Sequence, residues 1–128
     1  MARILIVEDE APLRHIVARN LERRGHHVIE SASAAEAGNA LRTQGSSKCD
    51  LILLDVNLPD ATGWDVLRQM SDSAGAAPKV IVMTALRPAQ SRIAAFQPAA
   101  VLLKPFPIEA LLRLVDRVLG QAGAESAP

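Results

Sequence analysis

The sequence contains a single cysteine, no tyrosine and only three aromatic residues, which are one tryptophan and two phenylalanines. One cysteine excludes an internal disulfide and a zinc site built on cysteines. The scarcity of aromatics leaves no stacking platform for single-stranded nucleic acid. Fourteen basic residues balance 14 acidic ones, so the formal net charge is 14 − 14 = 0. Without a basic surplus to neutralise phosphates, we expect no direct nucleic-acid binding.

Long apolar runs are also missing. None approaches the length of a membrane span, and the apolar stretch at the N-terminus is too short for a signal peptide. We therefore expect a cytoplasmic protein with no membrane insertion. The pair His26–His27 adjoins a predicted strand and does not share a helix face, which favours solvated histidines over metal ligands.

What the chain does have is an alternating pattern within 128 residues, of which 49% are hydrophobic and 22% charged, as suits one compact domain. Five short apolar runs alternate with five amphipathic stretches. Because several runs are continuously apolar, they are typical of strands covered on both faces. We predict strands at Arg3–Val7, His27–Ser31, Leu51–Asp55, Lys79–Met83 and Ala100–Leu103.

Helix signals fall between these runs. The first helix is predicted from an apolar face, with Pro12 near its start and Gly25 just past its end. That face consists of Leu13, Ile16, Val17 and Leu21. Residues 33–36 read as a capping box for the second helix. The third is predicted from Thr62 or Gly63 to Met70, the fourth between Pro88 and Pro98, and the fifth from about Pro107 to Leu119. This order predicts an open parallel α/β sheet with helices on both faces, in a domain of residues 1–120 followed by a flexible tail, 121–128.

Ligands of such sheets bind at the carboxyl ends of the strands, where this chain places polar residues. The predicted strand ends carry Glu8, Asp9, Asp55, Thr84 and Lys104. Clustered carboxylates repel one another unless a cation is present, and a hard oxygen site of this kind suits Mg²⁺. A lysine and a hydroxyl beside such a site favour phosphoryl chemistry with a carboxylate nucleophile. The alternative is that the acids cap helix N-termini, which is the reading we prefer for Glu10.

These residues resemble the receiver domain of bacterial two-component response regulators over nearly the whole chain. Glu8–Asp9 is similar to the acidic pair after the first strand, and residues 55–64 to the phosphoacceptor loop with its Pro and Gly. Thr84–Ala85 resembles the switch threonine and its small neighbour, and residues 104–106 the terminal lysine motif with a cis peptide before proline. The resemblance implies a doubly wound, flavodoxin-like (βα)₅ fold with strand order 2-1-3-4-5.

The resemblance also implies roles. Asp55 would take a phosphoryl group from a phosphohistidine on a sensor histidine kinase or phosphotransfer protein. Asp9, the Asp55 carboxylate and the Asn57 backbone carbonyl would bind Mg²⁺, and Glu8 would act through water. Lys104 would pair with Asp55 and then with the phosphoryl group, toward which Thr84 would move. The implied protein is a signalling phosphoacceptor that catalyses only its own phosphotransfer and dephosphorylation.

Two features depart from the family pattern. Val101 stands three residues before the lysine, where the family commonly has Tyr or Phe, whose rotation transmits the switch. The stretch from Thr84 to Lys104 is also slightly short. We therefore expect activation without an aromatic rotation, through a change in the segment after Thr84.

Three other functions compete with this interpretation. A haloacid dehalogenase-type phosphohydrolase would need a second Asp two residues after its nucleophile, where this chain has Asn57. Its nucleophile would also follow the first strand, whereas Asp55 follows the third. A flavodoxin-like electron carrier would have its FMN phosphate repelled by the acids at 8–10. A receiver-like module that is never phosphorylated would lack the acceptor or the lysine, and both are present.

The output is left open by the sequence, which fits a stand-alone regulator, a phosphorelay intermediate or the receiver part of a longer protein. The last helix carries a broad apolar stripe: Ile108, Leu111, Leu112, Leu114, Val115, Val118 and Leu119. Its width predicts either a downstream partner or self-association through the 86–119 face, or a broad core stripe with no such role.

Overall fold

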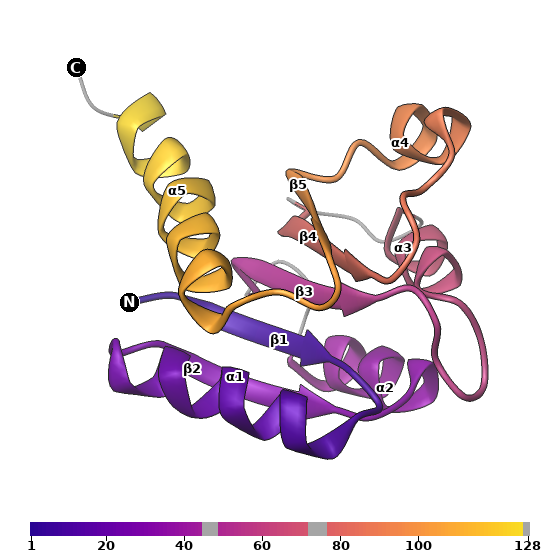
Figure 1. The fold of residues 1–128 in the computed structure, drawn as a ribbon, viewed down its shortest axis with the longest axis horizontal. Coiled ribbons are helices and arrows are strands. Elements are labelled where there is room, and N and C mark those ends of the chain that lie inside the picture. The colour runs from indigo at the N-terminus through magenta and orange to yellow at the C-terminus, as the bar shows by residue number, and fades with distance from the viewer. Residues whose placement is uncertain (45–48, 72–76, 127–128) are drawn as a thin grey trace.

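Five parallel strands form one sheet in the part of the chain that the computed structural model describes, residues 1–44, 49–71 and 77–126 (Figure 1). The sheet order is β2-β1-β3-β4-β5, as the resemblance implies. The strands are β1 (Arg3–Val7), β2 (His27–Ser31), β3 (Leu51–Asp55), β4 (Lys79–Thr84) and β5 (Ala100–Leu103). Four have the predicted bounds, and β4 is one residue longer. The fold is therefore the predicted doubly wound one.

A helix follows each strand. The helices are α1 (Ala11–Arg23), α2 (Ala34–Gln44), α3 (Gly63–Ser71), α4 (Gln90–Phe96) and α5 (Ile108–Ser126). Among these described elements no helix is both long enough and apolar enough to cross a membrane.

Local signals account for several helix ends. Gly25 adopts φ +92° just past α1, a conformation that glycine reaches without strain. Ser33 Oγ accepts the Glu36 N–H at 3.1 Å, which is half of the predicted capping box. The other half differs, because Glu36 Oε1 accepts the N–H of Ala32 instead of that of Ser33.

The start of α4 was predicted too early. Ala89 is extended (φ −63°, ψ 149°), so the helix begins at Gln90 instead of Pro88. It ends where Gln97 takes a left-handed conformation (φ 48°) ahead of Pro98. The result is a helix of seven residues, none of them buried.

Two apolar layers cover the sheet because successive strand residues point to opposite faces. On one face, β1 residues Ile4 and Ile6 pack with α1 and α5. On the other, Leu5 and Val7 pack with residues from α2 and α3. All five residues of β3 are buried, so the acidic end of this strand is held from both sides.

The helix faces were predicted with one error. Val17 and Leu21 of α1 are buried and Leu13 packs against the same layer, but Ile16 is 53% exposed. Ile16 lies at the edge of the face, and Ala18 takes the buried position instead. The α5 stripe belongs to the core: it includes Leu114 and Leu119, which pack partly buried against it. The packing thus assigns the α5 stripe to the core, and a partner elsewhere on the 86–119 face stays a prediction.

The helix α5 runs past its predicted end at Leu119, so that the backbone of residues 121–126 is helical. Gly120 lies inside the helix, where a Cβ would meet nothing within 4 Å, and it costs the helix only about 1 kcal/mol relative to alanine. The division into a domain of residues 1–120 and a flexible tail stays a prediction.

Candidate functional site

The strand ends bring the predicted polar residues to one edge of the sheet. The last ladder pair between β1 and β3 joins Val7 to Leu54, and the next residues are Glu8 and Asp55. Because the strands are parallel, their carboxyl ends meet at the same edge, marked by the arrowheads in Figure 1. Lys104 directly follows β5 and reaches the same place.

Three carboxylates cluster there. Glu8, Asp9 and Asp55 each offer an oxygen, and these oxygens all lie within 4.8 Å of one another. Glu8 and Asp55 are buried, whereas Asp9 is exposed and opens the cluster to solvent. Hard oxygen ligands at this spacing fit Mg²⁺, which keeps several of its own waters.

Lys104 is the cation of the site. Its Nζ lies 3.3 Å from Asp55 Oδ2, as predicted, but only 2.6 Å from Glu8 Oε1. It also lies 3.6 Å from Glu10 Oε1. Glu10 occupies the N-cap position of α1, as our capping interpretation expects, but its side chain makes no cap bond. Its carboxylate contacts the lysine instead.

Glu8 has the most perturbed environment of the three acids. Its side chain is fully buried, and burial raises its pKa to about 7, with a smaller contribution from the Asp55 charge. Lys104 and the Glu10 N–H, which donates to Glu8 Oε2 at 3.1 Å, act in the opposite direction. The Lys104 ammonium, 2.6 Å away, is the partner of Glu8 Oε1. Three carboxylates with Glu10 close by share this one ammonium, and a bound cation would relieve the repulsion between the acids.

The two carboxylates also act on Lys104. Burial alone would lower the pKa of its ammonium, but the Glu8 and Asp55 carboxylates outweigh burial and raise it. The lysine is therefore held in its charged form beside the acceptor.

The loop after Asp55 is folded back against its own strand. The Asn57 N–H donates to Asp55 Oδ1 at 3.2 Å, and the Gly63 N–H donates to the Val56 carbonyl at 2.8 Å. A Cβ on Gly63 would lie 2.5 Å from the Asp55 carbonyl oxygen, closer than any side chain tolerates. Gly63 is thus required by close backbone approach and not by its own backbone conformation.

Asp60 is a contact that sequence reasoning missed. Its two carboxylate oxygens accept the N–H groups of Ala34 and Ala35, both at 2.9 Å. These bonds lower the pKa of Asp60 and tie the loop after the acceptor to the start of α2. The sequence gives no local signal for this contact, because the partners are 25 and 26 residues apart.

Thr84 is buried at the end of β4, and its hydroxyl bonds to the backbone of Leu86. Thr84 Oγ1 donates to the Leu86 carbonyl at 3.0 Å, and the Leu86 N–H lies 3.3 Å from the same oxygen. Ala85 is exposed, which leaves space in front of the site. A hydroxyl that turned toward Asp55 would therefore release the backbone of Leu86.

The histidines do not form a metal site among the described residues. His27 is exposed, as predicted, but His26 is half-buried and its Nδ1 accepts the Ala2 N–H at 3.1 Å, so it is not simply solvated. His15 Nδ1 lies 2.8 Å from Glu30 Oε1. The acidic cluster is the only group of metal-ligating side chains that the described residues bring together.

Comparison with known proteins agrees with this geometry. Residues 4–116 match the model of the response regulator receiver domain. The "DNA-binding dual master transcriptional regulator RpaA" of Synechocystis sp. is 36% identical over 92% of this chain and 52% of its own length. The chain spans about half the length of the curated relatives that it matches.

Solved structures agree as well. The non-phosphorylated HemR receiver domain of Leptospira biflexa has a TM-score of 0.81 and 30% identity, covering 93% of this chain and 94% of that one. The response regulator TrrA of Thermotoga maritima, solved in complex with Mg²⁺-BeF, has a TM-score of 0.70 and 25% identity, covering 92% and 99%.

Proposed function

Since this chain belongs to the response regulator receiver domain family, we propose that Asp55 is its phosphoacceptor. The observation that carries the proposal is the setting of this carboxylate. Asp55 is buried at the end of the central strand, with the Lys104 ammonium at 3.3 Å and two further acids beside it. Asp50, at the other end of the same strand, has no such surroundings and binds the Arg3 N–H.

The reaction that we propose is a phosphoryl transfer. A carboxylate oxygen of Asp55 bonds to phosphorus while the bond from phosphorus to a histidine nitrogen of the donor breaks. The nitrogen keeps the bonding electron pair, and the product is an acyl phosphate. The Lys104 ammonium, which already contacts Asp55, would then contact a phosphoryl oxygen by a charge-assisted bond.

Mg²⁺ is the proposed cofactor. Asp9, Asp55 and the Asn57 backbone carbonyl would hold the ion, and Glu8 would act through water. Bound there, Mg²⁺ neutralises charge on the phosphoryl oxygens and on the acids. Three carboxylates whose oxygens all lie within 4.8 Å of one another, beside a single ammonium, support this choice.

The proposed partners are a sensor histidine kinase or phosphotransfer protein, met in the cytoplasm, and a downstream protein or second copy on the 86–119 face. Two large apolar side chains are exposed on that face, Leu86 (80%) and Leu103 (38%). The hydroxyl of Thr84 would pass the change on, because it bonds directly to the Leu86 backbone. Members of this family are signalling proteins and not classical enzymes.

The test is phosphorylation with acetyl phosphate and Mg²⁺, followed by intact mass. We expect one added phosphate, lost in Asp55→Asn and on chelation of Mg²⁺. The matched control is Asp50→Asn, on the opposite end of the same strand, which should keep the label. Undiminished labelling of Asp55→Asn would contradict the assignment.

A further inference from the structure

An arginine of α1 is attached to the backbone of the acidic turn. Arg14 Nη1 donates to the carbonyl oxygen of Glu8 at 2.8 Å, and Arg14 Nε donates to Glu30 Oε1 at 3.1 Å. The Arg14 side chain is only 13% exposed. A mostly desolvated guanidinium with two fixed acceptors has little freedom to move.

The Glu8 carbonyl belongs to the peptide group that joins Glu8 to Asp9, the exposed acid of the cluster. The other side of Glu8 is fixed too, because its N–H donates to the Ser31 carbonyl at 3.0 Å. With both backbone groups of Glu8 bonded, the direction in which the chain carries Asp9 is set. Arg14 supplies the bond that β-sheet pairing does not.

Glu30 holds the arginine in place from the neighbouring strand β2. The same Glu30 oxygen that accepts from Arg14 also lies 2.8 Å from His15 Nδ1. Two consecutive residues of α1 thus converge on one carboxylate, and Glu30 is 35% exposed. This arrangement links α1, β2 and the acidic turn in a single polar chain.

We propose that Arg14 is a positioning residue of the Mg²⁺ site: by holding the Glu8 carbonyl it orients Asp9 for cation binding, and Glu30 orients Arg14. The inference rests on the proposed function, since it assumes that the acidic cluster takes Mg²⁺. Arg14 itself contacts neither the cation nor the phosphoryl group.

Charge and positioning predict opposite results for removal of Arg14. A positive charge near a cation site disfavours the cation, so charge alone would make Arg14→Ala bind Mg²⁺ more tightly. Loss of positioning would make it bind more weakly, by roughly tenfold, which is the lower end of the effect of outer-shell partners. The sign of the change separates the two.

The experiment titrates MgCl₂ into the ¹⁵N-labelled, unphosphorylated chain and follows amide shifts of residues 8–10. We expect Arg14→Ala to raise the Mg²⁺ dissociation constant by roughly tenfold. Arg14→Lys, which keeps the charge but cannot reach both acceptors with a planar group, should fall between it and the wild type. Arg19→Ala removes an exposed arginine from the same helix and should leave the dissociation constant unchanged.

A second measurement distinguishes positioning from a loss of structure. Labelling by acetyl phosphate should need more Mg²⁺ in Arg14→Ala but reach the wild-type rate at saturating Mg²⁺, whereas a damaged fold would lower the rate at every concentration. If Arg14→Ala does not fold, the Arg14→Lys titration decides alone.

Glu30→Ala should weaken Mg²⁺ binding in the same direction. The double variant should bind Mg²⁺ no more weakly than Arg14→Ala, since both substitutions act through one guanidinium.

The outcomes separate this inference from the proposed function. An unchanged or tighter Mg²⁺ constant in a folded Arg14→Ala, beside a wild type that binds, overturns the positioning role alone. A wild type that binds Mg²⁺ but takes no phosphate overturns the proposed function alone. A wild type without Mg²⁺-dependent shifts overturns both the positioning role and the proposed cofactor.

Discussion

The central strand β3 and the region of α4 and β5 at one end of the sheet are packed very differently. At β3 every residue is buried, and the loop after it is tied down by Gly63 against its own strand and by Asp60 to α2. At β5 no residue is fully buried, and α4 has none buried either. The acidic edge is thus a fixed frame, whereas the α4–β5 region buries few side chains and is the part that a change at the site can move at low cost.

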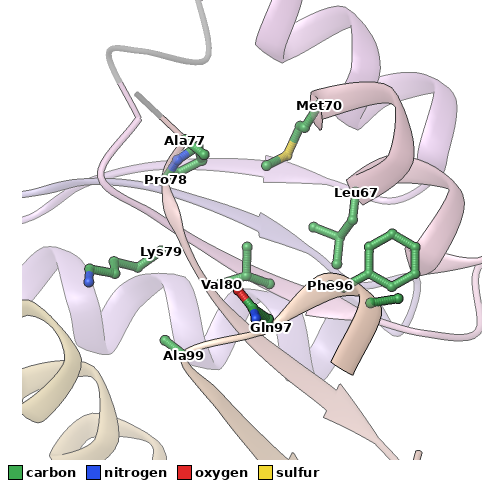
Figure 2. Close-up of a pocket in the computed structure, with 10 residues that line it drawn as sticks. Leu67, Met70, Ala77, Pro78, Lys79, Val80, Phe96, Gln97 and Ala99 are labelled. Carbon is green, nitrogen blue, oxygen red and sulfur yellow. The ribbon is translucent and has the colours of Figure 1, made fainter. Parts of the chain in front are cut away.

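Ring contacts join α4 to α3. Phe96 stacks on Trp64 of α3 with ring centroids 5.4 Å apart, and Arg92 lies 5.7 Å from the Trp64 centroid. A cavity of about 330 Å³ lies beside this contact, and Figure 2 shows Phe96 and Leu67 next to Val80 at its wall. Incomplete packing at the end of α4 agrees with its low burial.

The largest effect is expected in the fixed frame around β3. Leu53→Ala removes a fully buried side chain of β3, so it should lower the free energy of unfolding by about 2–5 kcal/mol. Urea denaturation measures this loss. A loss below about 1 kcal/mol would mean that β3 is not the rigid element described here.

Gly63→Ala tests the loop that presents the acceptor. The new Cβ would lie 2.5 Å from the Asp55 carbonyl oxygen, so the backbone must shift, at a cost of about 1–3 kcal/mol. The control is Gly120→Ala, where nothing lies within 4 Å and a helix position should gain up to about 1 kcal/mol. Thermal unfolding of both should give changes of opposite sign, and equal changes would contradict the close approach.

Phe96→Ala tests the α4–β5 region. Because Phe96 is only partly buried, the loss should stay below the about 3 kcal/mol typical of a core phenylalanine. Hydrogen exchange should accelerate at the α4 amides and stay unchanged in β3. Faster exchange in both α4 and β3 would show that these two elements unfold as one unit.

The smallest effect concerns pH. Burial lowers the pKa of His26, so the unfolded chain binds its proton more tightly than the folded chain does. The stability from His26 is present above the unfolded value near 6.5 and is lost as pH falls through the lower folded pKa. His26→Asn keeps an acceptor for the Ala2 N–H without titrating, so its unfolding free energy should fall less between pH 7.5 and pH 5. An identical pH profile would exclude His26 as the cause.

The sequence was sufficient for the fold where the signal is local and strong. Short apolar runs predicted all five strands, and the signal was strongest at β1, β3 and β4, because a strand covered on both faces admits few polar residues. The start of α4 was misplaced because Pro88 and Ala89 fit equally well in the first turn of a helix and in an extended segment that precedes one. Ile16 was misplaced because a helical face has edges that the period alone does not resolve.

The sequence predicted which residues form the site but not which carboxylate lies nearest to the lysine. Parallel strands place their carboxyl ends at one edge of the sheet, which predicts that the polar residues gather there, whereas the pairing of Lys104 with Asp55 came from the family resemblance. That Lys104 lies nearer to Glu8 depends on how deeply Glu8 is buried, which the sequence does not report. Asp60 bonds to the backbone of α2, and Arg14 bonds to the Glu8 carbonyl. Both are bonds from a side chain to the backbone of another segment, and no sequence motif predicts them.

The most direct test of the account compares amide NMR spectra with and without Mg²⁺ and beryllofluoride, which mimics the phosphorylated state. Beyond the residues that line the site, we predict shifts concentrated at residues 84–97, small shifts in β1 and β3, and no change of χ1 at Val101, whose β-branched side chain is stiff. Asp55→Asn should show none of these shifts. An unperturbed 84–97 segment, or a large χ1 change at Val101, would contradict the division into a fixed acceptor edge and a responsive α4–β5 region.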